Sequence, residues 1–228
     1  MFRYLILGNG SLKDYIISTL LTLPIILFSL SFHEFAHGYA AYKMGDHTAK
    51  NFGRLTLNPL KHLDPIGALC MLLAGFGWAK PVPINARNFK NPRVGMAISG
   101  AAGPISNLLL SLISALLLKL VYELISINLL PITTIISLTI TFLFLSIQLN
   151  IALAVFNLIP VPPLDGSRIF YAFLPPKLYF GIMKYERIIY LVLMGALMLG
   201  LLSGIISFVT TGIMKLLFFI VGLDGIFY

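Results

Sequence analysis

The segment HEFAH, residues 33–37, contains the residue types of a metal-dependent hydrolytic centre. On a helix, His33 and His37 are four residues apart and share one face, so both ring nitrogens can reach one zinc ion. In hydrolytic zinc sites with the pattern HExxH, the glutamate, here Glu34, takes a proton from the metal-bound water. A chance match is the alternative, but ionisable residues within an apolar stretch are rare and usually functional.

A catalytic zinc site needs a third protein ligand and an open position for water. A longer form of the motif continues with Gly and then His after the second histidine, but Ala40 and Lys43 occupy those positions. The third ligand must therefore come from another part of the chain. To identify it, the membrane-spanning segments must first be located.

The composition is that of an integral membrane protein. Of the 228 residues, 58% are hydrophobic and only 11% are charged, whereas soluble domains carry about 25% charged residues. The net charge of +8 does not indicate a nucleic-acid partner, because the basic residues lie between apolar segments and not in one tract with aromatic residues. The one cysteine, Cys70, cannot form an internal disulfide and is expected to be a small packing residue.

Four apolar stretches are long enough to cross a bilayer, which takes about 20 residues: 16–42, 94–118, 132–159 and 188–222. A break at Ser203-Gly204 would divide the last stretch into two helices. Residues 66–78 are shorter and rich in glycine, which favours a re-entrant segment or a short helix joined to hairpin strands.

We therefore expect an all-α polytopic membrane protein with about five transmembrane helices and a re-entrant or hairpin segment around residues 66–93. No charge-rich stretch is long enough for a separate soluble domain, so residues 1–228 are expected to form a single membrane domain.

The basic residues predict the orientation of these helices, because Lys and Arg concentrate in cytoplasmic loops. Twelve of the sixteen basic residues fall on one side of the predicted spans: Lys43, Lys50, Arg54, Lys61, Lys80, Arg87, Lys90, Arg93, Arg168, Lys177, Lys184 and Arg187. We expect that side to face the cytoplasm, with the N-terminus outside and the protein in the cell membrane.

Depth in the membrane favours Asp165 as the third ligand. A rise of about 1.5 Å per residue places His37 and His33 roughly 9 and 15 Å from the cytoplasmic boundary. Asp165 comes at the cytoplasmic end of a predicted span, in the proline-rich element NLIPVPPLDG, residues 157–166. Irregular backbone at membrane depth is tolerated only where it lines a cavity. The alternative role for Asp165 is the N-cap of a helix that begins at Gly166.

Three sequence elements together resemble the site-2 protease family of intramembrane zinc metalloproteases. HEFAH and NLIPVPPLDG are similar to the paired motifs of that family, and GAAGPISN, residues 100–107, is similar to its Gly-rich third motif. GRLTLNPLKHLDPIG, residues 53–67, and GWAKPVPINARNF, residues 77–89, resemble the small branch that lacks PDZ and CBS domains. The resemblance covers about residues 16–174.

The resemblance implies that His33, His37 and Asp165 bind one catalytic zinc ion and that Glu34 is the catalytic base. It also implies that Asn157 lies beside the site, in contact with substrate or with the oxyanion. The implied activity is hydrolysis of peptide bonds within or near transmembrane segments, as in regulated intramembrane proteolysis. The partners would be transmembrane protein substrates and the lipid bilayer; the sequence indicates no oligomeric state.

Several residues have simpler alternative roles. Asn157 could satisfy a backbone group at a helix end, and Asn107 could belong to a small-residue surface for helix packing, with a direct role at the site as the other possibility. His47, His62 and Asp64 are expected to be solvated or to stabilise turns. Residues 77–89 could present a strand edge to an unwound substrate or form a plain loop.

Two other functions compete with proteolysis. A membrane metal-ion transporter could use the same three ligands as a transit site, and an inactive relative could merely bind helices. Glu34 argues against both, because a pure binding site has no need of a carboxylate that is not a ligand.

Overall fold

The computed structural model describes residues 12–67, 70, 79–175, 178, 181–182 and 184–227, and helices dominate it. Four of the described helices are long and apolar enough to cross a membrane: α2 (Leu12–Lys43), α6 (Pro92–Ser126), α7 (Thr134–Asn157) and α11 (Ser203–Val221). No strand is present among the described residues. These findings confirm the all-α polytopic class, with four spanning helices where about five were predicted.

The predicted spans agree with these helices in position but not always in length. α6 continues to Ser126, eight residues beyond the predicted end at Leu118. The predicted break in the C-terminal stretch is present, since α10 (Glu186–Met198) ends shortly before α11 begins at Ser203. α10 has only 13 residues, too few to cross a bilayer of ordinary thickness.

The N-terminal ends of α6 and α7 are set by local capping. Asn91 precedes α6 and its side chain accepts a hydrogen bond from the Val94 amide, with Pro92 at the first turn. Thr133 precedes α7 and accepts in the same way from the Ile136 amide. Both caps satisfy amides that have no partner within the helix.

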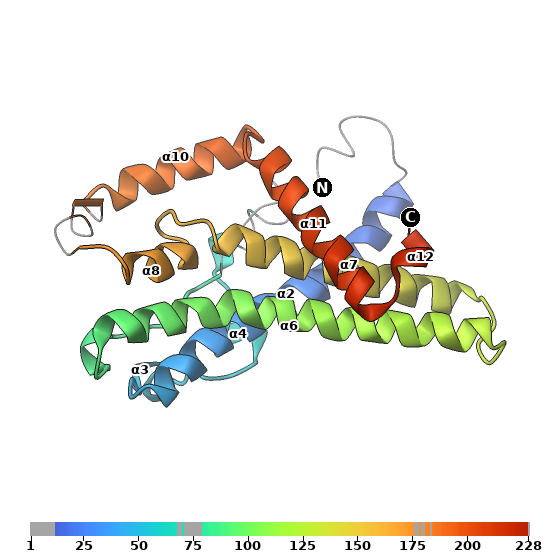
Figure 1. Cartoon of the computed structure of the whole chain (residues 1–228), viewed down its shortest axis with the longest axis horizontal. Coiled ribbons are helices and arrows are strands. Elements are labelled where there is room, and N and C mark those ends of the chain that lie inside the picture. Colours follow the sequence, from blue (N-terminus) through green and yellow to red (C-terminus); the bar gives the residue numbers. More distant parts are fainter. Residues whose placement is uncertain are drawn as a thin grey trace.

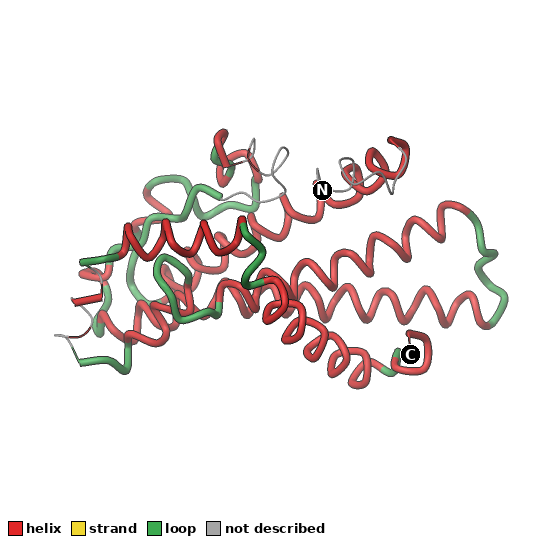
Figure 2. Tube along the Cα trace, turned by 90° about the horizontal axis from the view of Figure 1, so that it is seen from above, coloured by secondary structure: helices red, strands yellow, loops and turns green. Residues whose placement is uncertain are grey.

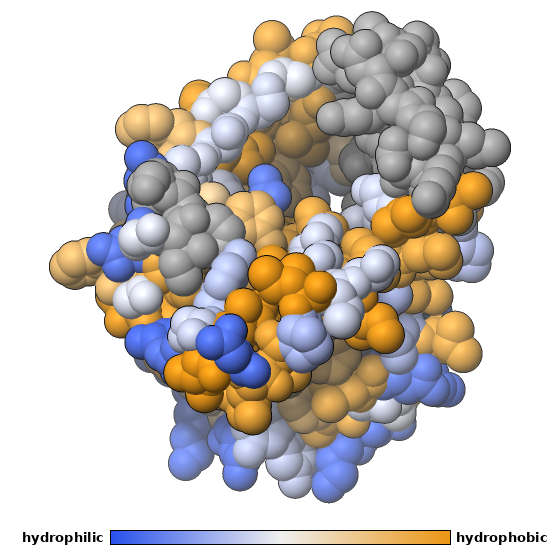
Figure 3. All heavy atoms as spheres, turned by 90° about the vertical axis from the view of Figure 1, so that its right-hand side faces the viewer, coloured by the Kyte–Doolittle hydropathy of each residue, from blue (hydrophilic) through white to orange (hydrophobic). Residues whose placement is uncertain are grey.

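α6 and α7 form an antiparallel pair that is visible in both ribbon views, with α11 crossing them (Figures 1 and 2). Side chains that are fully buried fill the space where the three helices meet: Ala115, Leu118, Ile147, Ile151 and Phe218. Large apolar side chains also face outward, and orange areas are prominent in the view of Figure 3. Such a surface is suited to lipid, since the hydrocarbon core requires apolar side chains around a helix.

The chain between α2 and α6 contains α3 (Thr48–Asn51), α4 (Pro59–His62) and the short helix η1 (Ala86–Asn88). Residues 68–69 and 71–78, within the predicted re-entrant or hairpin segment, lie outside the described residues. At its described edge, Leu63 and Ala79 form an isolated antiparallel bridge.

Asp46 connects the end of α2 to the segment before α6. Its buried carboxylate accepts hydrogen bonds from Thr48, from the Asn85 amide at 2.7 Å and from Asn88 Nδ2 at 2.7 Å. Burial disfavours the charged form, but these hydrogen bonds outweigh it and hold the pKa of Asp46 below its ordinary value. The residues after Ala79 are thereby fixed against α2.

The turn between α7 and α8 (Asp165–Tyr171) brings a carboxylate back to α2. The prolines after Asn157 end α7, because proline cannot continue the helical hydrogen bonding. Gly166 allows the chain to fold tightly here, since a Cβ on this residue would lie 2.6 Å from the Ile159 carbonyl oxygen. The N-cap of α8 is Leu164 and not Asp165, and no side chain caps the helix. The Asp165 side chain is therefore free of the N-cap role considered as its alternative.

Candidate metal centre

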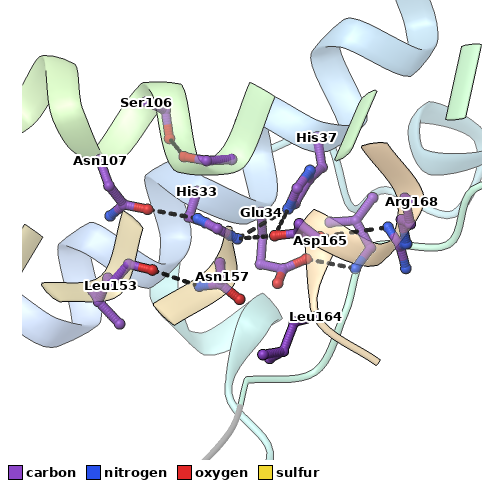
Figure 4. Close-up of polar contacts among 12 residues, drawn as sticks. His33, Glu34, His37, Ser106, Asn107, Leu153, Asn157, Leu164, Asp165 and Arg168 are labelled. Atoms are coloured by element: carbon purple, nitrogen blue, oxygen red, sulfur yellow. Dashed lines mark hydrogen bonds and ion pairs between the residues drawn. The ribbon is translucent and has the colours of Figure 1, made fainter. Parts of the chain in front are cut away.

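One buried cluster in the described part of the chain has the composition of a metal site: His33, His37 and Asp165. The histidines lie one turn apart on α2, and Asp165 is the first residue of α8 (Figure 4). Asp165 Oδ2 is 3.1 Å from the Nε2 atom of each histidine, and the two Nε2 atoms are 2.9 Å apart. All three side chains are at least nine-tenths buried.

The other nitrogen of each ring has a hydrogen-bond acceptor supplied by α6. His37 Nδ1 is 2.6 Å from the backbone oxygen of Ser99, which can only accept, so Nδ1 carries the proton. His33 Nδ1 is 2.6 Å from Asn107 Oδ1, which requires the same tautomer. In neutral rings, both Nε2 atoms then carry lone pairs and point toward Asp165.

The cluster therefore brings three electron-pair donors together with no hydrogen between them. Such an arrangement is repulsive unless a cation occupies the common point, and histidine nitrogens with a carboxylate are ligands that zinc accepts. Tetrahedral zinc with ligand distances of about 2.0 to 2.2 Å separates neighbouring donors by roughly 3.3 Å. The observed separations of 2.9 and 3.1 Å need to widen by only a few tenths of an ångström, so these residues fit the ion.

Arg168 contacts the second oxygen of Asp165. Its Nη1 atom is 3.8 Å from Asp165 Oδ1 within the same helix, α8. A partner on the outer oxygen fixes the carboxylate orientation and leaves Oδ2 directed at the histidines, as second-shell partners do in metal sites.

Glu34 lies next to the cluster without belonging to it. Its Oε2 accepts a hydrogen bond of 2.7 Å from the Val82 amide, in the segment that joins Ala79 to η1. Val82 is buried and packs close to Gly38 of α2, since a Cβ on that glycine would lie 3.1 Å from Val82 Cγ1. The segment thus places a backbone donor against the carboxylate that the sequence identified as the base.

Gly103 of α6 leaves room for both histidine rings. A Cβ at this position would lie 2.5 Å from His37 Cε1 and 2.6 Å from His33 Cε1, distances at which something must shift. Neither ring can retreat easily, because each is held through Nδ1 by another residue of α6.

Gly103→Ala should therefore weaken metal binding. Overpacking of this kind costs about 1 to 3 kcal/mol, which corresponds to a roughly 5- to 150-fold lower metal affinity. Competition with a chelator on the purified protein measures it. Gly212→Ala on α11 is the matched control, since a Cβ there meets no atom of the described residues within 4 Å. Equal affinities for the two variants would show that the rings are not confined by α6.

The structure places the remaining predicted residues in different environments. Asn157 is the last residue of α7, and its Nδ2 donates to the Leu153 backbone oxygen at 3.0 Å, which is the helix-end role considered as its alternative. His47 pairs with the Gly45 oxygen, and His62 with the Thr56 oxygen. Asp64 accepts from backbone amides two and three residues ahead. These last three residues stabilise turns, as expected.

Several contributors to the site were not identified from the sequence, among them Arg168, Ser99, Val82 and Asn150. The Ser99 contribution is a backbone carbonyl and the Val82 contribution is a backbone amide, so neither has a side-chain signal. Asn150 of α7 contacts Asn107, and its polar amide inside an apolar stretch was a signal that could have found it.

Comparisons with known proteins identify relatives of this chain. Residues 21–203 match Peptidase family M50. The "Putative zinc metalloprotease YwhC" of Bacillus subtilis is 48% identical over 166 residues, which cover 73% of this chain and 72% of that protein. The "Putative zinc metalloprotease Rip2" of Mycolicibacterium smegmatis is 32% identical over 145 residues, or 61% of this chain and 52% of that protein. No solved structure matches the chain at a significant level.

Proposed function

Because this chain belongs to Peptidase family M50, the site-2 protease family, we propose that it is an intramembrane zinc endopeptidase that cleaves transmembrane segments of membrane proteins. The observation that carries the proposal is the convergence of His33, His37 and Asp165 beside Glu34. Both histidines and Glu34 lie on α2, a helix apolar enough to span the bilayer. A zinc-dependent protease needs three such ligands and a carboxylate beside them.

In the proposed mechanism, His33, His37 and Asp165 hold the metal and Glu34 is the general base. Bound zinc would polarise the scissile carbonyl and make a bound water more acidic. Glu34 takes a proton from the attacking water as the water oxygen bonds to the carbonyl carbon, and it delivers that proton to the amine nitrogen as the C–N bond breaks. The α6 contacts to both Nδ1 atoms keep the Nε2 lone pairs directed at the metal position.

The protein is a multi-pass membrane protein, and we propose that the site faces the cytoplasmic side, with the N-terminus outside. α2 ends at Lys43, and the helical rise puts His37 and His33 roughly 9 and 15 Å from that end. The basic residues between α2 and α6 support this orientation.

A substrate helix must unwind before its peptide bond can reach the site, because its own backbone hydrogen bonds shield that bond. We propose that the unwound strand pairs with the segment 79–85, which passes Glu34. Pro81 and Pro83 lack N–H groups, and the Val82 amide already donates to Glu34, so the Ile84 amide is the donor that we propose for the substrate. Pairing with this segment would fix the substrate by its backbone and not by a particular side chain.

Substrate form is the test of this function. A single-pass membrane protein in liposomes should be cut within or near its transmembrane segment. Replacing a helix-breaking Gly or Pro near the scissile bond by Leu should slow cleavage, since each adds roughly 1 (Gly) to 3 (Pro) kcal/mol to the cost of unwinding. Mass spectrometry of the products locates the cut, and the Glu34→Gln protein is the matched control for contaminating proteases.

Two results would contradict the proposal. Cleavage confined to soluble loops, with no response to helix-breaking residues, would remove the intramembrane part. Zinc uptake into vesicles that carry the protein, with no proteolysis of any membrane substrate, would favour transport.

A further inference from the structure

Two buried asparagines link His33 to the backbone of a third helix. Asn107 lies on α6 and Asn150 on α7, and neither side chain is measurably open to solvent, with exposed fractions of 0% and 1%. Asn107 Nδ2 donates to Asn150 Oδ1 at 2.9 Å. Asn150 Nδ2 in turn donates to the backbone oxygen of Ser146 at 2.9 Å. An amide buried among apolar helices is costly unless paired in this way.

This chain of amides has only one consistent direction. The Ser146 backbone oxygen can only accept, so the nitrogen of Asn150 must face it and the oxygen of Asn150 must face Asn107. Asn107 then presents its nitrogen to Asn150 and its oxygen to His33. The backbone of α7 therefore determines, through two side chains, which nitrogen of the His33 ring carries the hydrogen.

We propose that Asn107 and Asn150 are positioning residues that hold His33 in the Nδ1–H tautomer, with its Nε2 lone pair directed at the metal. The inference rests on the proposed function in one respect, that His33 is a metal ligand. Neither asparagine is proposed to touch substrate. Asn107 is fully buried, its oxygen contacts His33 (Figure 4) and its nitrogen donates to Asn150, which argues against the direct role at the site that its sequence position left open.

His37 provides an internal control. Its Nδ1 hydrogen goes to the Ser99 backbone oxygen, which no side-chain substitution at the asparagines removes. Changing Asn107 or Asn150 should therefore alter the tautomer of His33 and leave that of His37 unchanged.

Nitrogen NMR of ring-labelled histidine in the metal-free protein, at a pH where the rings are neutral, reads the tautomers directly. In the wild type, both rings should be Nδ1–H. Asn107→Leu should shift His33 toward Nε2–H, because the acceptor is lost. Asn107→Asp should retain Nδ1–H, because a carboxylate oxygen still accepts. Asn150→Leu leaves Asn107 in place but frees its amide to rotate, so His33 should become a mixture of tautomers.

Zinc affinity, measured by chelator competition, tests the same assignment without any substrate. Loss of a partner behind a metal-bound histidine lowers affinity about 10- to 100-fold, and Asn107→Leu should fall in that range. Asn150→Leu should have a smaller effect, and the double variant should match Asn107→Leu alone, because Asn150 acts through Asn107. Ser111→Ala is the control, since Ser111 is buried on α6 and its hydroxyl donates within that helix, to the Leu108 oxygen.

The outcomes separate this inference from the proposed function. A shifted His33 tautomer and weaker zinc binding support the positioning role even if no transmembrane substrate is cut. Unchanged tautomer and zinc affinity in Asn107→Leu, with a raised KM, would overturn it in favour of substrate contact. Additive effects of the two substitutions would also overturn it. Should Asn107→Leu fail to fold by circular dichroism, Asn150→Leu carries the same test.

Discussion

Glu34→Gln should bind zinc with wild-type affinity and cleave a transmembrane substrate at least about 100-fold more slowly, since general-base catalysis contributes about 10²- to 10⁴-fold. The amide has the shape of the carboxylate, and its oxygen can still accept the hydrogen bond from the Val82 amide. It cannot take a proton from water at neutral pH. The metal ligands are untouched, so the loss should appear in the rate and not in metal content.

Atomic absorption and a cleavage assay on the same preparation measure the two quantities. Glu123→Gln is the matched control, because that glutamate lies near the end of α6, is 61% exposed in its side chain and pairs with Lys119. It should show neither effect. Cleavage by Glu34→Gln at a rate near that of the wild type would refute the assignment of Glu34 as the base.

Asp165→Ala should lower zinc affinity by more than about 100-fold, because losing even a second-shell partner costs about 10- to 100-fold. The substitution removes the one anionic ligand of the cluster and leaves two neutral imidazoles. It also leaves Arg168 without the carboxylate that neutralises it, 3.8 Å away. A positive charge so close to the metal position adds to the loss.

Chelator competition at equal helical content tests this expectation. Asp64→Ala is the suitable control, since that carboxylate accepts hydrogen bonds from two backbone amides of its own turn. Asp46→Ala is less suitable, because Asp46 is buried and connects α2 to the segment before α6; its loss should destabilise the fold without removing a ligand. Retained zinc in Asp165→Ala, with loss of zinc in Asp64→Ala, would mean that the third ligand is misassigned.

The sequence contained enough information to locate the helices and to select the cluster. The length of the apolar stretches alone located α2 and α7, because a segment that crosses the bilayer must be apolar over about 20 residues and must satisfy its own backbone hydrogen bonds as a helix. The prolines after Asn157 predicted an irregular turn at membrane depth, and the structure has α8 begin at Asp165 after that turn. Each of these signals lies within a short stretch of consecutive residues, so it can be recognised without knowing how the helices pack.

The supporting contacts could not be predicted in the same way. The acceptor for His37 is a backbone oxygen 62 residues away, and the donor to Glu34 is a backbone amide 48 residues away. Every residue except proline has such an amide, so residue type does not mark the ones that are used. Asn107 was visible as a polar residue in an apolar helix. Whether it faces His33 depends on the orientation of α6 about its own axis when it packs on α2, which the sequence does not specify.

The orientation of α6 about its axis has a thermodynamic consequence. Ser99, Gly103 and Asn107 are spaced by four residues and form one stripe of α6 that faces α2. Ser99 provides the acceptor for His37 and Asn107 the acceptor for His33. Gly103 leaves room for both rings. Turning or sliding α6 would disturb all three contacts at once. Metal affinity and the association of α2 with α6 are therefore thermodynamically linked. The free energy by which correct packing of α6 on α2 favours metal binding equals the free energy by which the bound metal favours that packing.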